Sequence, residues 1–404
     1  MKIIFISPVY YPSPYGGALA LKLLAEGIAE RGHEVTVFAF DGDKVSEEKS
    51  VSGVKLVRYQ RIKRLANIAP SPKLIPRVIS VMRQWQNKTD LFHICTSPLV
   101  GAGIYKILGG RKPVVATLEA YGGFCPLSSA LCPSDNCSFI QRLKCLFEGR
   151  KAGQKILAIP YAAIYPLLIS LMKKADRYIA ASQVVKRKYV AHGYDEEKID
   201  VIPNFYEEQI NPSGTEVAHK PHTFNILYVG RLNKEKSVNI LIQAFFELAK
   251  GNPNVQLTIV GEGYLSEGKA LRKLVSKLKI DKQVFFIGEV PHEDVWRYYK
   301  AADVFVHPAI WAEPFGLTIL EAMQFQLPLI VSNAGAPPEI AGDAGLVFEK
   351  GNVNDLAQKL GLVYKDEKLR QKLSSNCSKV LQNYDRDKII DGIETLYQQV
   401  VSGS

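Results

Sequence analysis

Two glutamates stand eight positions apart in the stretch "EPFGLTILEA", and no basic residue lies between them. Glu313 comes just before a Pro-Phe-Gly turn, and Glu321 falls two helical turns further along an apolar run. Two carboxylates on an apolar surface are energetically costly unless another group binds them. The spacing therefore indicates a binding site in which both glutamates accept hydrogen bonds or ion pairs.

Two cations follow a predicted strand earlier in the same half of the chain. The stretch "YVGRLNKEKS" ends this strand at Gly230 and then presents Arg231 and, at the start of the next helix, Lys236. The exposed amides and the dipole of a helix N-terminus add to the two positive charges, so this turn suits a diphosphate. A pair of solvated surface cations is the alternative interpretation.

Two further glycine turns follow predicted strands. The turn "VGEG" contains Gly261 and Glu262 and is a weak signal by itself. In "EPFG", Phe315 and Gly316 bring backbone amides to the start of a helix that we predict over residues 317–326. The N-terminus of that helix also favours an anionic ligand.

The combination of "GRLNKEKS", "VGEG", "AADVFVHPAIWAEPFGLTILEAM" and "SNAGAPPEIAGDAGLVF" resembles the retaining glycosyltransferases of the GT-B fold that carry an E-x7-E signature. This family is also called glycosyltransferase family 4, or glycosyl transferases group 1. The stretches "PVYYPSPYGGALALKLLAEGIAERGHEVTV" and "ADRYIAASQVVKRKYVAHGYDEEKIDVIPN" match it too, so the resemblance covers essentially the whole chain. It implies two Rossmann-like domains and transfer of a sugar from a nucleotide diphosphate-sugar with retained configuration.

The resemblance also implies roles for single residues. Glu321 would accept hydrogen bonds from the ribose of the donor, Glu313 would lie at the transferred sugar, and Arg231 and Lys236 would clamp the diphosphate. The other donor contacts that it implies are Gly16, Gly17, Asn204, Gly230, Gly261, Glu262, Val290, Phe315, Gly316 and Leu317. A UDP-sugar is favoured over GDP-mannose as the donor, and the acceptor is expected to be a glycan or a lipid-linked molecule of cell-surface polysaccharide or glycoconjugate synthesis.

Fixed positive charge suits the chemistry that the resemblance implies. Breaking a sugar–diphosphate bond builds negative charge on the leaving phosphate, and one preorganised group that stabilises such charge contributes about 100- to 1,000-fold in rate. No Asp-x-Asp pair is placed to hold Mg²⁺, and Arg231 and Lys236 supply the positive charge instead. We therefore expect no cofactor and no metal requirement.

The sequence departs from the family pattern in "TLEAYGGFCP". Many members have a His-Asp pair there, whereas this chain has Glu119 and Ala120. The Glu119 carboxylate could hold a sugar hydroxyl or act as a base on the acceptor, and we include it among the candidate catalytic residues. Altered donor choice or lost activity are the alternatives. Cys95 stands where a second histidine is common, and we expect the nearby His93 to be packed rather than catalytic.

Two competing functions follow from these features. One is a nucleotide-sugar epimerase or hydrolase of the same fold, against which the E-x7-E signature argues. The other is an inactive, donor-binding partner subunit, which the glutamate at position 119 motivates. A nucleic-acid partner is excluded, because the basic residues are not interleaved with aromatic residues in a recognisable module.

Four cysteines fall within one short segment, at spacings that do not include CxxC. Without that spacing a zinc site is unconvincing, so we expect free thiols, with a structural zinc or disulfides as alternatives. The four residues are Cys125, Cys132, Cys137 and Cys145.

An apolar segment with basic flanks follows, "ILAIPYAAIYPLLISLM" over residues 156–172. Two prolines and an interior serine make it a poor membrane span. Residues 1–200 contain 29 Lys/Arg and 16 Asp/Glu, a net charge of +13, whereas the remaining 204 residues contain 22 and 24, a net charge of −2. These features motivate docking of the N-terminal half on an anionic membrane surface. A buried helix with a solvated basic surface is the alternative.

Continuous apolar runs that alternate with helical segments predict two doubly wound parallel α/β sheets. We expect a Rossmann-like acceptor-side domain over residues 1–203, to which a crossover helix at 384–404 returns, and a donor domain over residues 204–383. Ligands are expected in a cleft between them. The opening "MKIIFISPVY" reads as a buried strand rather than a signal peptide, so we expect a cytoplasmic protein that is peripheral on the inner membrane face.

Overall fold

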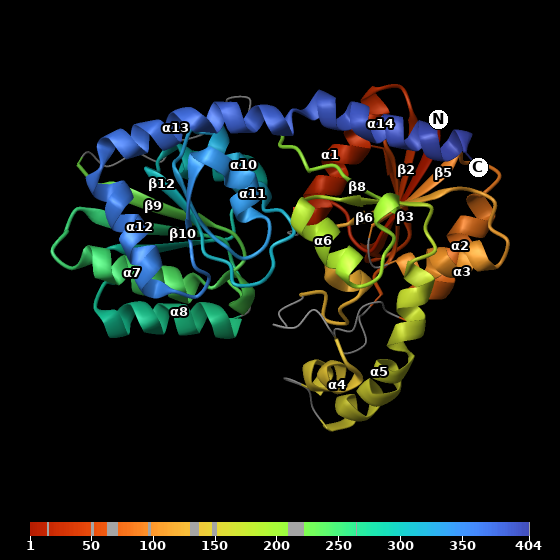
Figure 1. Ribbon diagram of the computed structural model, residues 1–404, viewed down its shortest axis with the longest axis horizontal. Coiled ribbons are helices and arrows are strands. Elements are labelled where there is room, and N and C mark those ends of the chain that lie inside the picture. Colours follow the sequence, from red (N-terminus) through yellow and green to blue (C-terminus); the bar gives the residue numbers. More distant parts are fainter. Residues whose placement is uncertain are drawn as a thin grey trace. The chain divides into compact units, whose positions relative to one another are not determined.

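The computed structural model contains two compact α/β units (Figure 1). Unit 1 comprises Met1–Asn204 and Arg386–Ser404, and unit 2 comprises Phe205–Asp385, so the divisions lie within two residues of those expected. The structure describes residues 1–13, 16–49, 52–62, 72–95, 98–129, 137–147, 152–208, 222–263 and 265–403.

Unit 1 is built on an eight-stranded sheet with the order β3-β4-β2-β1-β5-β6-β7-β8. Every pair is parallel except β3 and β4 at one edge. The five residues of β5 and of β6 are all buried, which explains why these strands are almost entirely apolar, with only His93 and Thr117 as polar members. The strands are β1 Lys2–Ser7, β2 Glu34–Gly42, β3 Ser46–Lys49, β4 Lys55–Gln60, β5 Leu91–Cys95, β6 Val114–Leu118, β7 Arg177–Ala180 and β8 Ile199–Val201.

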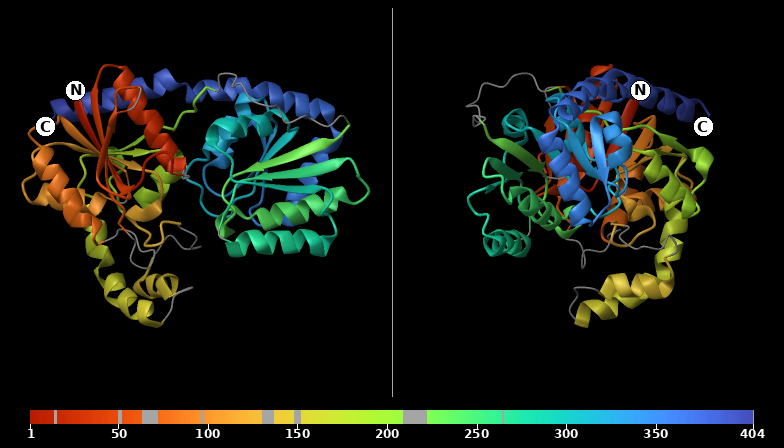
Figure 2. Two further views of the ribbon diagram at one scale, coloured as in Figure 1. Left: turned by 180° about the vertical axis from the view of Figure 1, so that it is seen from behind. Right: turned by 60° about the vertical axis from the view of Figure 1, so that its left-hand side comes forward.

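The helices of unit 1 include the last helix of the chain, which follows unit 2 in sequence, and two helices, α4 and α5, that project away from the sheet (Figure 2). The helices are α1 Gly16–Glu30, α2 Leu74–Trp85, α3 Leu99–Ile107, α4 Phe139–Phe147, α5 Ala152–Met172, α6 Gln183–Ala191 and α14 Arg386–Ser402, with 3-10 turns η1 Tyr121–Gly123 and η2 Glu196–Lys198. No helix in the described ranges is both long and apolar enough to cross a membrane.

Unit 2 is built on a six-stranded, all-parallel sheet with the order β11-β10-β9-β12-β13-β14. Its strands are β9 Phe224–Val229, β10 Val255–Val260, β11 Val284–Gly288, β12 Val304–His307, β13 Leu329–Ser332 and β14 Gly345–Phe348. Its helices are α7 Val238–Ala249, α8 Leu265–Leu278, α9 His292–Lys300, α10 Leu317–Gln324, α11 Pro337–Ala341, α12 Val353–Lys365 and α13 Glu367–Leu381, with 3-10 turns η3 Lys234–Lys236, η4 Gly342–Ala344 and η5 Gln382–Tyr384.

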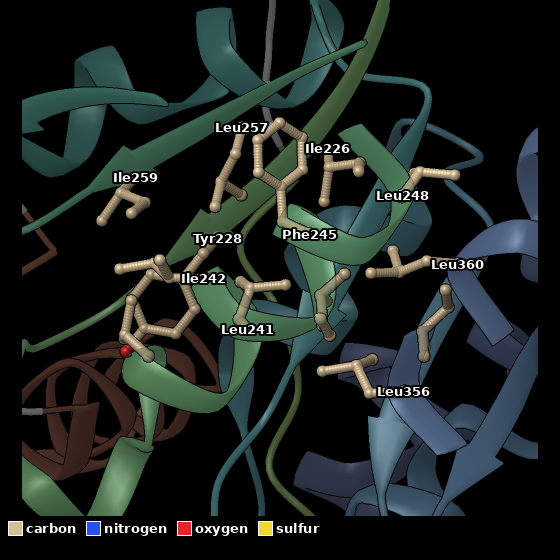
Figure 3. Packing of buried hydrophobic residues seen from close by; sticks show 14 of the residues in the cluster. Ile226, Tyr228, Leu241, Ile242, Phe245, Leu248, Leu257, Ile259, Leu356 and Leu360 are labelled. Carbon is tan, nitrogen blue, oxygen red and sulfur yellow. The ribbon is translucent and has the colours of Figure 1, made fainter. Parts of the chain in front are cut away.

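The core of unit 2 shows why this sequence forms a sheet covered by helices. Phe245 and Leu241 of α7 point onto β9 and β10, where they meet Ile226 and Leu257 (Figure 3). Leu360 of α12 lies beside α7 in the same cluster. All five side chains are completely removed from solvent, and full burial of such a side chain typically contributes about 1.5–3 kcal/mol.

In each sheet the strand order reverses beside the first strand of the unit. In unit 1, β2 and β5 flank β1, and in unit 2, β10 and β12 flank β9. The loops that follow β9 and β12 therefore come together at the carboxyl edge of the sheet, where ligands bind in doubly wound folds. The predicted fold class, two doubly wound parallel sheets, is confirmed.

Candidate active site

The loops after β9 and β12 bring Lys236 and Glu313 into direct contact. Nζ of Lys236 donates a hydrogen bond to Oε2 of Glu313, and the two side chains are only 15% and 9% exposed. Both residues were expected in the site, but Lys236 was expected at the diphosphate of the donor and Glu313 at the transferred sugar. Removing one partner of a buried pair of this kind typically costs about 3–5 kcal/mol, because the other charge is then buried without a partner, so each residue constrains the other at this edge of the sheet.

Lys236 lies in a separate turn rather than at the start of the next helix, where it was expected. It closes the 3-10 turn η3, in which its backbone N–H donates to the side chain of Asn233 (3.3 Å). Ser237 then adopts a left-handed conformation with φ 50°, and α7 begins only after it. The helix, which was predicted over residues 237–250, therefore begins one residue later than expected, because this capped turn comes first.

Trp311 and His307 complete the surroundings of Glu313, and neither was expected there from the sequence. Nε1 of Trp311 donates to Oε2 of Glu313 (2.8 Å), and its ring centroid lies 5.6 Å from the ammonium group of Lys236. Nε2 of His307, at the end of β12, lies 3.5 Å from the same carboxylate oxygen. The sequence feature that could have indicated these two residues is the stretch "HPAIWAEP", in which a histidine and a tryptophan lie between the end of a strand and the first glutamate.

The charges of this cluster are set by burial and by Lys236. Burial alone raises the pKa of Glu313, but the positive charge of Lys236 and the hydrogen bonds from Lys236 and Trp311 lower the pKa below its usual value. Burial and the same lysine lower the pKa of His307 to about 4. At neutral pH the cluster therefore contains one ammonium, one carboxylate and a neutral imidazole.

The backbone of Glu313 is held by the segment that follows β13. The N–H of Glu313 donates to the carbonyl of Ala334 (3.2 Å), and the N–H of Ala336 donates to the carbonyl of Glu313 (2.9 Å). Between these contacts Gly335 has φ +91°, and a Cβ there would lie 2.3 Å from the nitrogen of Glu313. Gly335 therefore permits the close approach that fixes Glu313, a role that was not expected from the sequence.

Glu321 on α10 also has protein partners, both of them on α9. The hydroxyl of Tyr299 donates to Oε2 of Glu321 (2.7 Å), and Nε2 of His292 lies 3.2 Å from Oε1. The contact with Glu321 raises the pKa of His292 against the opposing effect of burial. Because a carboxylate offers about four acceptor positions, two further hydrogen bonds can still form at Glu321.

The predicted helix after "EPFG" begins one residue after the glycine. Gly316 has φ 109°, and α10 starts at Leu317. Phe315 is buried and packs edge to face against Tyr384, with ring centroids 5.8 Å apart. The first amides of α10 lack helical partners, as at any helix N-terminus, so they are available for a ligand.

Two of the predicted glycine turns pack directly against each other. A Cβ on Gly261 would lie 2.1 Å from the carbonyl oxygen of Gly230, and the N–H of Leu232 donates to the carbonyl of Glu262 (3.0 Å). These glycines therefore have a structural role in addition to any contact with a ligand. Arg231, in the same turn, has an exposed side chain.

Unit 1 brings together the predicted loop glycines and Glu119. Glu119 follows β6, and a Cβ on Gly17 in the first turn of α1 would lie 2.9 Å from Oε2 of Glu119. Burial raises the pKa of Glu119 to about 8, and a hydrogen bond with the thiol of Cys95 opposes this only in part. Its carboxyl is therefore largely protonated at neutral pH and can donate a hydrogen bond. Gly16 precedes Gly17 on the exposed side of the loop.

Other residues singled out in the sequence lie apart from these clusters. His93 is buried in β5, as expected, and its two ring nitrogens lie 2.5 Å from the hydroxyls of Tyr397 and Thr117. Asn204 is partly exposed at the end of unit 1, and Val290 is partly exposed between β11 and α9.

The cysteines in the described residues are thiols that take part in no disulfide, and Cys132 lies outside those residues. The described parts of the chain contain no cluster of three or more His, Cys, Asp or Glu side chains that could hold a metal ion. The thiols are Cys95, Cys125, Cys137, Cys145 and Cys377.

Comparison with known proteins matches both halves of the chain. Residues 15–209 match the protein family described as "Glycosyltransferase Family 4", and residues 215–380 match the family described as "Glycosyl transferases group 1". The alpha-monoglucosyldiacylglycerol synthase of Acholeplasma laidlawii is 25% identical over 99% of this chain and 98% of its own. The O-antigen chain mannosyltransferase B of Escherichia coli is 26% identical over 92% of each chain.

Solved structures share the fold over the full length. The sucrose-phosphate synthase of Thermosynechococcus elongatus has a TM-score of 0.75 at 20% identity and covers 100% of both chains. Anabaena HepE, solved in complex with UDP-glucose, has a TM-score of 0.71 at 22% identity and covers 98% of this chain and 100% of its own.

The two sheets and these matches define a glycosyltransferase of the GT-B fold that uses a nucleotide-sugar donor. The chain belongs to glycosyltransferase family 4, also described as glycosyl transferases group 1, and is a retaining hexosyltransferase.

Proposed function

We propose that the protein transfers a hexose from a UDP-sugar to a glycan or lipid-linked acceptor, as one step in the synthesis of a cell-surface polysaccharide or glycoconjugate. The observation that carries this proposal is the meeting of Lys236, Glu313 and the turn of Arg231 at the switch point of unit 2. This edge combines positive charge with the N-terminus of α10, as a diphosphate requires.

The residues act on charge that develops as the donor is cleaved. The bond between the anomeric carbon and the diphosphate breaks, and the bonding electrons leave with the phosphate. Arg231, Lys236 and the first amides of α10 stabilise that charge. The acceptor hydroxyl forms the new bond to the same carbon and gives its proton to the departing diphosphate oxygen. The remaining acceptor positions of Glu321 bind ribose hydroxyls, while Glu313 binds the hexose and orients Lys236.

The relatives support the choice of substrates. HepE was solved with UDP-glucose, which favours a uridine nucleotide over GDP-mannose. The name of the Acholeplasma relative describes synthesis of a glycolipid, and that of the Escherichia relative describes synthesis of an O-antigen chain. These two names describe a lipid product and a glycan product, which supports a glycan or lipid-linked acceptor.

Thermal shift with UDP, GDP, ADP and their common sugar conjugates tests the donor. A ligand at 100 times its Kd stabilises the folded protein by about 2.7 kcal/mol, and we expect this shift with UDP and UDP-sugars. A larger shift with GDP would overturn the choice of nucleotide. Absence of any shift would overturn the assignment of a donor site. A shift without turnover on any acceptor would favour the inactive, donor-binding partner subunit, and release of the sugar without an acceptor would favour a hydrolase.

Two variants test the assignment of the donor residues. Arg231→Ala removes an exposed cation and Glu321→Ala removes the ribose acceptor, so each should reduce turnover at least tenfold while the protein remains folded. Lys234→Ala is the matched control, because Lys234 is an exposed cation in the same loop and has no assigned contact with the donor. Rates equal to those of the wild type in either test variant would contradict the assignment.

A further inference from the structure

The helices α4 and α5 leave an uncharged apolar face in contact with solvent. They project away from the sheet of unit 1 in both Figure 1 and Figure 2. Along the middle of α5, the exposed residues are all apolar, namely Ile159, Pro160, Ala163, Ile164, Pro166 and Leu167. Leu167 is 62% exposed and Ile164 49% exposed, whereas large apolar side chains of a helix usually face a core.

The exposed face is not needed to hold the two helices together. A small separate cluster joins them on the opposite face, formed by Leu146 of α4 with Tyr161, Ala162 and Tyr165 of α5. The hydroxyl of Tyr165 also donates to the carbonyl of Gly122 (3.2 Å), which anchors α5 to the rest of unit 1. The outer apolar residues are therefore additional to the folding core.

The first turn of α4 also has large apolar side chains that are exposed. Ile140 is 65% exposed and Phe139 is 42% exposed. Five of the large apolar side chains that are exposed in the described chain thus belong to these two helices. A concentration of this kind indicates an interaction surface rather than scattered surface residues.

The sequence around these two helices is predominantly basic. Residues 137–175 contain seven Lys/Arg and one Asp/Glu, Glu148, which lies outside the described residues. Lys155 and Lys174 lie at the two ends of the exposed face of α5, and both are exposed. Lys174 lies two residues beyond the end of α5, so the two lysines are 19 positions apart and flank most of the helix. Lysines at these positions can extend past the apolar strip to anionic groups.

We propose that the outer face of α4 and α5 docks on an anionic lipid bilayer, with α5 lying in the plane of the interface. The exposed apolar side chains of α5 would insert at the boundary between the headgroups and the acyl chains, while the lysines at both ends contact phosphate headgroups. A protein partner would need acidic groups arranged around an apolar ridge, whereas an anionic bilayer supplies both chemistries continuously. Docking would place the enzyme beside a lipid-linked acceptor, but it does not depend on the identity of the donor.

Co-sedimentation of the full chain with vesicles, without nucleotide sugar, tests the surface. We compare phosphatidylcholine vesicles with vesicles that contain about 30% phosphatidylglycerol, at low and at high salt. Recovery of the wild type should be at least fivefold higher on the anionic vesicles and should fall at high salt. Equal recovery on both kinds of vesicle at low salt would overturn the proposal.

Two double variants test whether the exposed residues of α5 and its flanking lysines form the docking surface. Ile164→Glu with Leu167→Glu, and separately Lys155→Glu with Lys174→Glu, should each reduce recovery at least fivefold. All four positions are exposed, so the variants should fold, and circular dichroism checks this. The matched controls carry the same changes elsewhere in unit 1, namely Ile107→Glu with Leu108→Glu, and Lys44→Glu with Lys198→Glu; these residues are also exposed.

The remaining outcomes separate a bilayer from other occupants of the face. If the controls reduce binding as much as the test variants, the interaction is a general effect of charge and the proposal fails. If the wild type forms dimers without vesicles and Ile164→Glu with Leu167→Glu abolishes them, the face is an interface between two copies and the proposal fails as well. Because no donor is present, neither result depends on the proposed glycosyl transfer.

Discussion

Among the single residues of unit 1, Glu119 has a carboxyl whose pKa is raised strongly by folding. It lies against the first turn of α1, where Gly17 leaves room for its carboxyl, and its partner is the buried thiol of Cys95. Burial raises its pKa to about 8 from an ordinary value of about 4.5. The folded protein therefore keeps a proton on Glu119 that the unfolded chain loses near pH 4.5.

Stability should consequently fall as pH rises through this window. Between about pH 4.5 and pH 8 the native state binds one more proton at Glu119 than the unfolded state, so this group lowers the free energy of unfolding with increasing pH. Glu119→Gln keeps a neutral side chain of similar shape and removes the effect. We expect the free energy of unfolding of the wild type to decline relative to that of the variant from about pH 5 to about pH 8.

Chemical denaturation of both proteins from about pH 5 to about pH 9 makes this comparison. Above about pH 8 the two curves should run parallel, because Glu119 is then ionised in both states. Curves that stay parallel over the whole range would show that the carboxyl keeps its ordinary pKa. In that case Glu119 would be a charged group in the active site rather than a hydrogen-bond donor.

Residue types and spacing predicted the candidate site in part. Glu313 and Lys236 were selected from separate motifs, but their contact joins residues 77 positions apart and depends on β9 and β12 being neighbours. Trp311 was hidden because an aromatic residue near an apolar run is usually part of a core. Only the geometry reveals that its N–H contacts Glu313.

At the level of elements, the segment after β13 fixes the position of Glu313, and Gly335 is the residue that allows it. Gly335→Ala would introduce a Cβ 2.3 Å from the nitrogen of Glu313 at a φ of +91°. We expect a loss of more than about 1 kcal/mol in the free energy of unfolding. Turnover should fall more than tenfold, because Glu313 would be displaced from its productive position.

Gly268→Ala is the matched control for this prediction. Gly268 lies in α8, and a Cβ added to it would have no atom within 4 Å. Alanine in a helix is more favourable than glycine by about 0.5–1 kcal/mol, so this variant should be slightly more stable and fully active. Urea unfolding and steady-state rates measure both effects. Wild-type behaviour of Gly335→Ala would mean that the segment after β13 does not constrain Glu313.

The elements that position the site could be predicted because they are strongly apolar. The apolar runs over residues 90–95 and 255–261 predict buried strands, and they form β5 and β10 with one boundary of each shifted by one residue. By contrast, β3 was not predicted, since its sequence "SEEK" is polar and it pairs only with β4 at the edge of the sheet. An edge strand of this kind has no apolar alternation to reveal it.

At the scale of the whole molecule, unit 1 is completed by a helix that the chain reaches only after unit 2. The helix α14 buries one apolar face, formed by Ile389, Ile390, Ile393, Leu396, Tyr397 and Val400. Arg31 at the end of α1 lies 3.0 Å from both Asp387 and Asp391, and His33 lies 2.5 Å from Glu394. The C-terminal segment is therefore part of the core of unit 1 rather than an appendage.

Deletion of residues 386–404 should destabilise unit 1 selectively. The deletion would expose the apolar residues that α14 covers and leave Nδ1 of His93, whose pKa burial lowers to about 3, without the hydroxyl of Tyr397. In hydrogen exchange, the amides of β1 and β5 should lose protection while those of β9 and β12 retain it, because the core of unit 2 contains no residue of α14.

Tyr397→Phe is the graded control: it keeps the buried ring, removes only one hydrogen bond and should lower the free energy of unfolding by about 1 kcal/mol. If exchange in β5 of the deletion variant matched the wild type, α14 would not belong to the cooperative core of unit 1, and the division of the chain into these two units would have to be redrawn.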